Sequence, residues 1–195
     1  MSGGNFFGGD FPILWVLLGL FAIVAIWFAA TYNGLIRHVN FCNDSWADID
    51  TELKRRYDLI PNLVETVRGY AKHEADLLAR VTEARNKAAA SHHSPREQAA
   101  DENRLVGQLR QLVAVAESYP DLKANANFLA LQGELVNTED RIQRARRFYN
   151  ANVRDLNTRI EVIPSNFVAS MFGFQRREYF EIEEAAQREA VKVSV

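Results

Sequence analysis

The sequence LKRRYDLIPNLVET, from Leu53 to Thr66, decides how this chain folds because its helical pattern contains a proline. Apolar residues stand on both sides of Pro61 at spacings of three and four, as in a helix that packs against neighbours. A proline inside a helix removes one backbone hydrogen bond, here the bond to the Tyr57 carbonyl, and costs about 3 kcal/mol. We therefore expect either a helix bent at Pro61 or a second helix capped by Asp58.

The apolar pattern extends far to both sides of this stretch. Its steps alternate between four and three until a four-residue step is repeated just before Pro61, which shifts the apolar face. A bend there would let the face follow a bundle whose neighbouring helices change along its length. The pattern consists of Leu35, Val39, Cys42, Trp46, Ile49, Leu53, Tyr57, Ile60, Val64, Val67 and Ala71.

Three more helices follow, separated by clear stops. Gly69 suits the end of the first helix. Ser94, Pro95 and Glu97 form a capping box that begins the third. The sequence SYPD at 118–121 ends the third, because a residue before proline avoids helical angles. The apolar faces are Leu77, Val81, Ala84 and Ala88 in the second helix; Leu105, Leu109, Leu112 and Ala116 in the third; and Phe128, Leu131, Leu135, Ile142, Ala145, Tyr149, Val153 and Leu156 in the fourth, expected over 124–160.

These patterns predict an all-α protein without strands. Helices joined by short turns pack up and down, so residues 32–162 are expected to form an antiparallel four-helix bundle with two long and two short helices. The two short helices can cover only part of the length of the two long helices.

A membrane anchor is expected before the bundle. Residues 11–30, FPILWVLLGLFAIVAIWFAA, contain no charge and are long enough to span a bilayer, so we predict a transmembrane helix over 11–31 after a short tail, 1–10. A cleaved signal peptide is the rival interpretation, but it would need basic residues before the apolar run, and MSGGNFFGGD has none. Arg37 follows the span, which favours an N-terminus outside and a C-terminal domain in the cytoplasm.

The C-terminal segment 163–195 is expected to start near the membrane, because the fourth helix returns toward the anchor. It opens with apolar residues followed by arginines. Such a segment suits a helix at the membrane surface or a contact with a partner protein, and the alternative is that it folds back as a cap on the bundle. The residues concerned are Phe167, Val168, Met171, Phe172, Phe174, Arg176 and Arg177.

No pattern typical of a catalytic or metal site stands out. The histidines His38, His73, His92 and His93 lack metal-ligand spacing, and the carboxylates Asp48, Asp50, Glu52, Asp58, Glu65 and Glu83 lack the accompanying Glu-x-x-His pairs of di-iron bundles. We interpret Glu52 and Arg56 as an ordinary surface pair, and Cys42 as a core residue. A metalloprotein or enzyme is thus a minor alternative, with no cofactor expected.

The charge of the chain argues against nucleic acid as a partner. The net charge is -2, which gives no cationic field. The basic residues Lys54, Arg55 and Arg56 admit a lipid or RNA interpretation, but salt bridges within the bundle are favoured over it.

Several long motifs resemble the LemA family of bacterial membrane proteins. They are WADIDTELKRRYDLIPNLVETVRGYAKHEADLLARVTEARNKA, ESYPDLKANANFLALQGEL, RRFYNANVRDLN and PSNFVASMFGFQRREYF, and the resemblance covers the chain from Tyr32 onward. It implies one N-terminal transmembrane helix, a helical bundle and a place in the bacterial inner membrane. Relatives in the family are associated with membrane organisation, including magnetosome formation, and some are encoded beside a membrane metalloprotease, so a membrane protease is one expected partner. The resemblance assigns no catalytic residues to this chain.

The leading hypothesis from the sequence is a membrane-anchored helical scaffold or adaptor. It would act by self-association as a homo-oligomer, or by docking other envelope proteins. The second hypothesis is an oligomeric membrane-remodelling protein in which the anchor and residues 166–174 both contact lipid.

Overall fold

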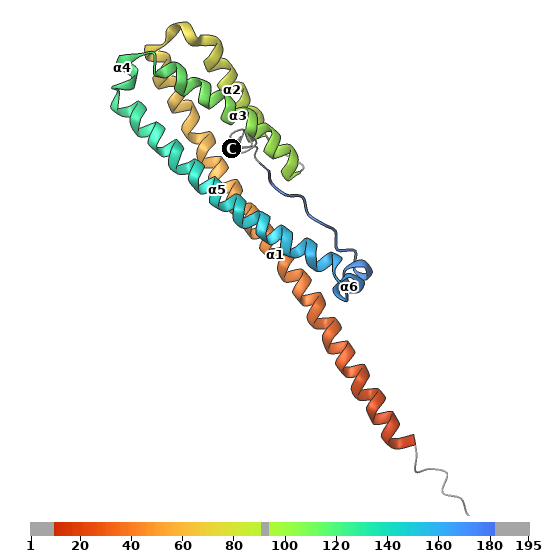
Figure 1. Ribbon diagram of the computed structural model, residues 1–195. Coiled ribbons are helices and arrows are strands. Elements are labelled where there is room, and N and C mark those ends of the chain that lie inside the picture. Colours follow the sequence, from red (N-terminus) through yellow and green to blue (C-terminus); the bar gives the residue numbers. More distant parts are fainter. Residues whose placement is uncertain (1–9, 91–93, 182–195) are drawn as a thin grey trace, which may run out of the picture. The chain divides into compact units, whose positions relative to one another are not determined.

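The computed structural model describes residues 10–90 and 94–181, with the backbone alone for 10–12, and this part of the chain consists of helices and short connections, without a strand (Figure 1). The all-α prediction is therefore confirmed. Residues 1–9 of the predicted tail 1–10, His92, His93 and residues 182–195 lie outside the described residues, whereas Asp10 begins the first helix. The helices are α1 Asp10–Tyr70, the short 3-10 helix η1 Lys72–Glu74, α2 Ala75–Ala89, α3 Pro95–Ala116, α4 Pro120–Lys123, α5 Ala126–Glu161 and α6 Ser165–Met171.

The chain divides into two compact units. The first, here called the anchor unit, consists of Met1–Phe41 and Arg154–Arg176, and the second, the bundle unit, consists of Cys42–Val153 and Arg177–Val195. Helices α1 and α5 each contribute one part to each unit. The expected domain boundaries at residues 31 and 162 stay predictions.

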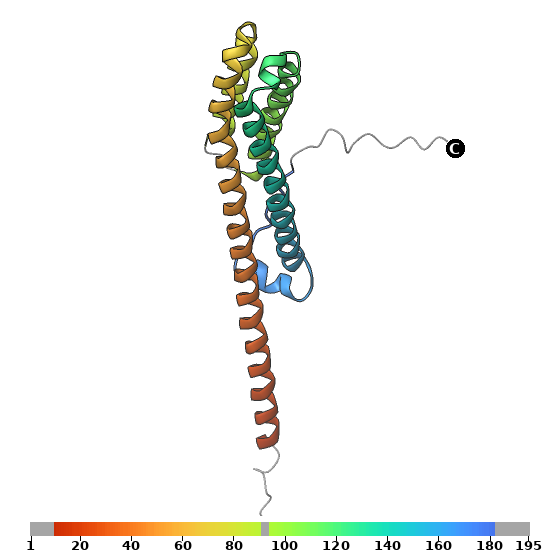
Figure 2. The same cartoon turned by 90° about the vertical axis from the view of Figure 1, so that its left-hand side faces the viewer.

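In the bundle unit, side-chain pairs fix the directions of the long helices. The rings of Trp46 and Tyr149 lie 5.3 Å apart, and Arg56 binds Glu139 at 2.7 Å. Higher residue numbers in α1 thus meet lower numbers in α5, so the two run antiparallel (Figure 2). Tyr57 binds Gln98 of α3, so α3 begins about midway along the part of α1 in this unit. These directions are those of an up-down bundle.

Helix α1 continues without interruption through Pro61. The alternative of a second helix capped by Asp58 is therefore wrong. The Tyr57 carbonyl, which Pro61 deprives of its helical donor, accepts a hydrogen bond from Nε of Arg85 at 3.1 Å. Because α2 supplies this donor, the buried helix keeps its carbonyl satisfied. The bend itself stays a prediction.

The predicted helix ends agree with the structure at three places. Helix α1 ends one residue after Gly69. The Ser94 side chain accepts a hydrogen bond from the Glu97 backbone at 3.2 Å, as in a capping box. Helix α3 ends at Ala116, before the SYPD sequence. The short helix α4 was not expected; it begins with Pro120, whose fixed backbone angle suits a first helical turn.

A short extended segment completes the bundle unit. Residues 177–181 have no helical structure, yet the Phe180 side chain is 0% exposed and packs on Trp46 at 5.4 Å between ring centroids. The Asn150 amide binds both the backbone N–H of Phe180, at 2.9 Å, and its carbonyl, at 3.0 Å. This segment packs on α1 at Trp46 and on α5 at Tyr149. Trp46 precedes Tyr57, the residue of α1 at which α3 begins.

The anchor unit holds the apolar part of α1. Within the described residues, one helix is long and apolar enough to cross a membrane, with a mean hydropathy of 2.7 over its most apolar window and none of that window buried. Phe172, the residue after α6, packs on it through its ring, which lies 5.8 Å from that of Phe28 and 4.6 Å from that of Tyr32. Gly173 follows two residues after the end of α6 and has a φ of 70°, an angle that favours glycine.

Candidate functional site

The centre of the bundle unit contains a buried polar cluster built around Arg56. Its guanidinium pairs with Glu102 of α3 and with Glu139 of α5, the latter at 2.7 Å. Arg56 is 1% exposed and Glu102 0%. Two carboxylates face one guanidinium, so the cluster has an excess negative charge. Hydrogen bonds from neighbouring side chains stabilise it. The cluster joins three helices through groups that tolerate little displacement.

Tyr57 and Gln98 complete the cluster. The Tyr57 hydroxyl bonds Glu102 and the Ala88 carbonyl, the latter at 2.9 Å, and the Gln98 amide donates to Glu102 at 2.8 Å. Burial raises the pKa of Tyr57 to about 12, against the opposing effect of the Arg56 charge. Burial also lowers the pKa of Arg56, which the Glu139 carboxylate counteracts. The cluster thus links α1, α2, α3 and α5.

The interpretation of Arg56 as a surface residue paired with Glu52 is wrong. Glu52 instead lies 4.0 Å from Arg55 and 3.7 Å from Arg141. The more general expectation, that the basic residues form salt bridges within the bundle, is confirmed for Arg56. Sequence reasoning missed Glu102 entirely. It falls on the apolar stripe of α3, three residues before Leu105, and a carboxylate on such a stripe was the available signal.

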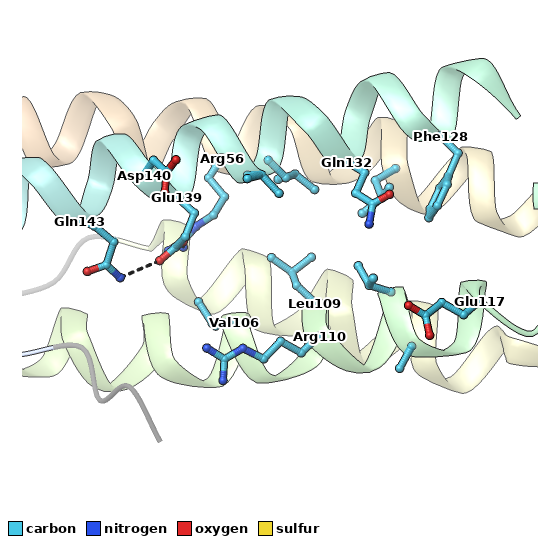
Figure 3. Close-up of a pocket in the computed structure, with 15 residues that line it drawn as sticks. Arg56, Val106, Leu109, Arg110, Glu117, Phe128, Gln132, Glu139, Asp140 and Gln143 are labelled. Atoms are coloured by element: carbon cyan, nitrogen blue, oxygen red, sulfur yellow. Dashed lines mark hydrogen bonds and ion pairs between the residues drawn. The ribbon is translucent and has the colours of Figure 1, made fainter. Parts of the chain in front are cut away.

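A groove adjoins the cluster in the same unit (Figure 3). Its volume is about 580 Å³, within the range of small-molecule and peptide sites. Arg56 and Glu139 lie at one side, and Gln143 binds Glu139 at 3.0 Å. Its apolar walls come from α1, α3 and α5: Leu63, Val106, Leu109, Val113, Phe128, Leu135 and Val136. Leu131 and Leu135, both expected in the core, are only half-buried, and Leu135 lines this groove.

The predicted C-terminal site lies mostly in the anchor unit. Val168 is buried, whereas Phe167 and Met171 are 64% and 70% exposed. Phe174 packs on Tyr32 at 5.8 Å. Arg176 binds Glu161 at 2.9 Å, while Arg177 belongs to the bundle unit. Part of the segment therefore packs within the protein, and one face of α6 is exposed. Its contact with lipid or a partner stays a prediction.

The remaining candidates for chemistry are dispersed. Cys42 is fully buried, as expected of a core residue. His38 lies in the anchor unit beside Phe41, at 6.0 Å, and burial lowers its pKa. His73 lies in η1. In the part of the chain that the structure describes, no group of three or more histidines, cysteines or acids is placed to hold a metal.

Comparison with known proteins gives a consistent result. The model of the LemA family matches residues 45–195. Protein LemA of Metamycoplasma hominis is 27% identical over 89% of this chain and 79% of its own length. Magnetosome protein MamQ 2 of Paramagnetospirillum magneticum is 38% identical over 37% of this chain. The match spans only 27% of that magnetosome protein.

Proposed function

Because this chain belongs to the LemA family, we propose that it is a single-pass membrane protein that acts as a helical scaffold or adaptor without catalysis. It works by self-association or by docking other envelope proteins. Its partners are membrane lipid, further copies of itself and other membrane proteins, with a membrane protease as one example.

One observation carries this proposal, namely the exposure of α1 in the anchor unit. Its large apolar side chains from Ile13 to Trp27 are between 40% and 72% exposed on every face of the helix. Each such side chain loses about 1.5–3 kcal/mol when it stays in water instead of an apolar medium. Lipid is the medium that suits a helix of this length without charges. The same helix then supplies a core stripe to the bundle unit.

The location that we propose is the bacterial inner membrane. Arg37 follows the span, whereas the ten residues before Phe11 contain no lysine or arginine. The positive-inside rule then favours a bundle unit in the cytoplasm and an N-terminus outside.

Crosslinking of the full-length protein in living cells tests the scaffold. We expect two products: adducts between copies of this chain, and adducts with a small set of membrane proteins. A chain found only as an uncrosslinked monomer, at a crosslinker dose that captures a known membrane oligomer in the same cells, would contradict the proposal.

A second candidate function, membrane remodelling, is favoured by the exposed face of α6. Phe167 and Met171 point away from the protein, and a helix of this kind suits the lipid headgroup region. Full-length protein in vesicles should then change the vesicle shape, as seen by electron microscopy. The double variant Phe167→Asp, Met171→Asp should abolish that change. Phe172 is a poor choice for this test, because its ring also packs on Tyr32. If vesicles keep their shape with the native protein, membrane remodelling is excluded, and the scaffold function is the remaining proposal.

A further inference from the structure

A patch of exposed apolar side chains lies beside α1, where the apolar part of this helix ends. It is carried by α6 and by the turn that precedes α6, and both belong to the anchor unit, alongside α1 (Figure 2). The ring of Phe172 marks its level, because it packs on Phe28 and Tyr32. These two residues stand just before and just after Ala30, the last residue of the apolar run. The boundary patch therefore lies where the predicted span meets the lipid headgroups. Its members are 46–77% exposed, and they are Val162, Ile163, Phe167, Met171 and Phe172.

The Arg159 side chain lies against α1 just beyond this level. Its Nη1 atom is 4.0 Å from the position that a Cβ atom on Gly34 would take. Gly34 follows Ala30 by four residues, a rise of about 6 Å, and the headgroup layer is about 5–8 Å thick on each side of a bilayer. Burial lowers the pKa of His38, one turn after Gly34, and the Arg159 charge adds to this effect. Arg159 is therefore at the depth of the headgroup layer, and His38 adds no charge there at neutral pH.

This side of the anchor unit carries a surplus of positive charge. The residues of the unit after Ala30 contain four arginines and two acids, a net charge of +2, whereas the whole chain carries -2. Arg176 binds Glu161 at 2.9 Å, so these two charges largely cancel. The remaining three arginines are all exposed, and in the described part of the chain none of them has an acid within ion-pair distance. They are Arg37, Arg154 and Arg159.

Two of these arginines lie on the same part of α1. Arg159 lies at Gly34, and Arg37 follows Gly34 by three residues, a step that leads to a neighbouring position on the helix surface. Arg154 is five residues before Arg159, which places it on another face of α5 and about 8 Å farther from the span. Asp155 lies one turn farther from the span than Arg159 and offsets part of the charge. The end of the span is therefore flanked by two guanidinium groups, which suit phosphate oxygens.

We propose that Arg37 and Arg159 bind the phosphate groups of anionic phospholipids, with the boundary patch against the acyl chains of the same lipids. Anionic lipids fit better than zwitterionic ones, because a zwitterionic headgroup brings its own cation toward the two guanidinium groups. The anchor unit then selects the lipids around it through charges that come from two segments far apart in the sequence. This inference rests on the membrane anchor in the proposed function and names the class of lipid that surrounds it.

Native mass spectrometry of the full-length protein tests this proposal. The protein is reconstituted in vesicles of equal parts phosphatidylglycerol and phosphatidylcholine and is then released into a mild detergent. The ratio of the two bound lipids measures the preference, and we expect the native protein to retain mostly phosphatidylglycerol. An arginine near an anionic surface contributes about a fivefold preference, so Arg37→Gln combined with Arg159→Gln should lower the ratio by on the order of tenfold.

A second double variant, Arg154→Gln with Arg176→Gln, is the matched control. It removes the same two charges from the same unit, but Arg154 lies farther from the span and Arg176 is already paired with Glu161. Charges beyond a Debye length of about 8 Å contribute little, so the ratio should change by less than about twofold. Equal losses in the two double variants would overturn the proposal, because any surplus of positive charge would then explain the preference.

Two further measurements separate the ways in which the proposal can fail. Inorganic phosphate in place of chloride, at equal ionic strength, should leave the lipid ratio unchanged. A selective loss in phosphate would mean that the arginines bind the free anion, which overturns the assignment to lipid. Alkaline extraction of the vesicles measures the anchor itself. A native chain that resists extraction but binds both lipids equally overturns this inference alone, and a native chain that is extracted overturns the membrane anchor as well.

Discussion

The two parts of α1 differ in how they use the same backbone. From Ile13 to Trp27 every face carries exposed apolar side chains, whereas from Cys42 to Val67 most buried residues follow an apolar stripe and most exposed residues are polar. A helix that is apolar on all sides suits lipid, and one with a stripe suits a bundle in water. The second part also buries a charge, Arg56, which pairs with two carboxylates. The comparison teaches that the surrounding medium, and not the helix itself, decides which side chains α1 can carry.

The largest effect is expected when the charge cluster is broken. Arg56→Ala leaves Glu102 buried without its cation and should lower the free energy of unfolding of the bundle unit by about 3–5 kcal/mol. Thermal or chemical unfolding in detergent measures this loss. Arg55→Ala is the matched control, because Arg55 is exposed and its pair with Glu52 should contribute less than about 1 kcal/mol. Equal losses for the two variants would contradict the burial of Arg56.

A lysine placed in each part of α1 sharpens the comparison. Val24→Lys puts a charge in the middle of the apolar span and should disfavour membrane insertion by about 2.5–3.5 kcal/mol. Asp48→Lys puts the same charge at an exposed position of the bundle unit and should leave insertion unchanged. The fraction of each variant that resists alkaline extraction from membranes reports the difference. If Val24→Lys is extracted no more readily than the native chain, α1 does not cross the bilayer as described.

The buried tyrosine predicts a loss of stability at high pH. Burial raises the pKa of Tyr57 from 10.0 to about 12, so the folded state holds its proton more tightly than the unfolded state. Its contribution is complete below pH 10 and should decline as the pH rises from 10 toward 12, by on the order of 2 kcal/mol. Unfolding is measured at several pH values across this range, and the free energy of unfolding should change less with pH for Tyr57→Phe than for the native protein. Burial also raises the pKa of Tyr149 to about 12, so this residue adds a loss of stability over the same pH range. The double variant Tyr57→Phe, Tyr149→Phe should therefore show the smallest change of unfolding free energy with pH.

The smallest loss of stability is expected from the Tyr57 carbonyl, which lacks a helical donor because residue 61 is a proline. Arg85→Met removes the donor that the Tyr57 carbonyl accepts, at a cost of about 1–2 kcal/mol. Pro61→Ala restores a helical N–H to that carbonyl, so the same Arg85→Met change should cost less in the Pro61→Ala background. A double-mutant cycle of unfolding free energies measures the coupling. Additive losses would show that Arg85 stabilises the unit by other contacts.

Much of the fold was predictable because it depends on local rules. The spacing of Leu35, Cys42 and Ile49, the cap at Ser94 and the apolar span each act over one or two helical turns. The buried cluster was not predictable in the same way, because Arg56 and Glu102 are 46 residues apart and meet only once the helices pack. Phe180 was missed for the same reason: it lies in an extended segment without periodicity and is buried by tertiary contact with Trp46.

The groove was likewise beyond local rules. The stripe of α5 predicted Leu135 in the core, and the structure places it in the groove wall because α3 and α5 leave space between them. Helical periodicity identifies the apolar face but not the element that covers it.

The most direct test of the account is a scan of spin labels along α1 of the full-length protein in bilayers, from residue 13 to residue 70, with oxygen and a water-soluble nickel reagent as probes. We predict that labels over 13–28 are accessible to oxygen on every face. Labels beyond 42 should be accessible to the nickel reagent with a period of about 3.6 residues. Periodic access of the nickel reagent over 13–28 would mean that this part of α1 is covered by protein on one side and by water on the other. That result would contradict the membrane anchor on which the proposed function depends.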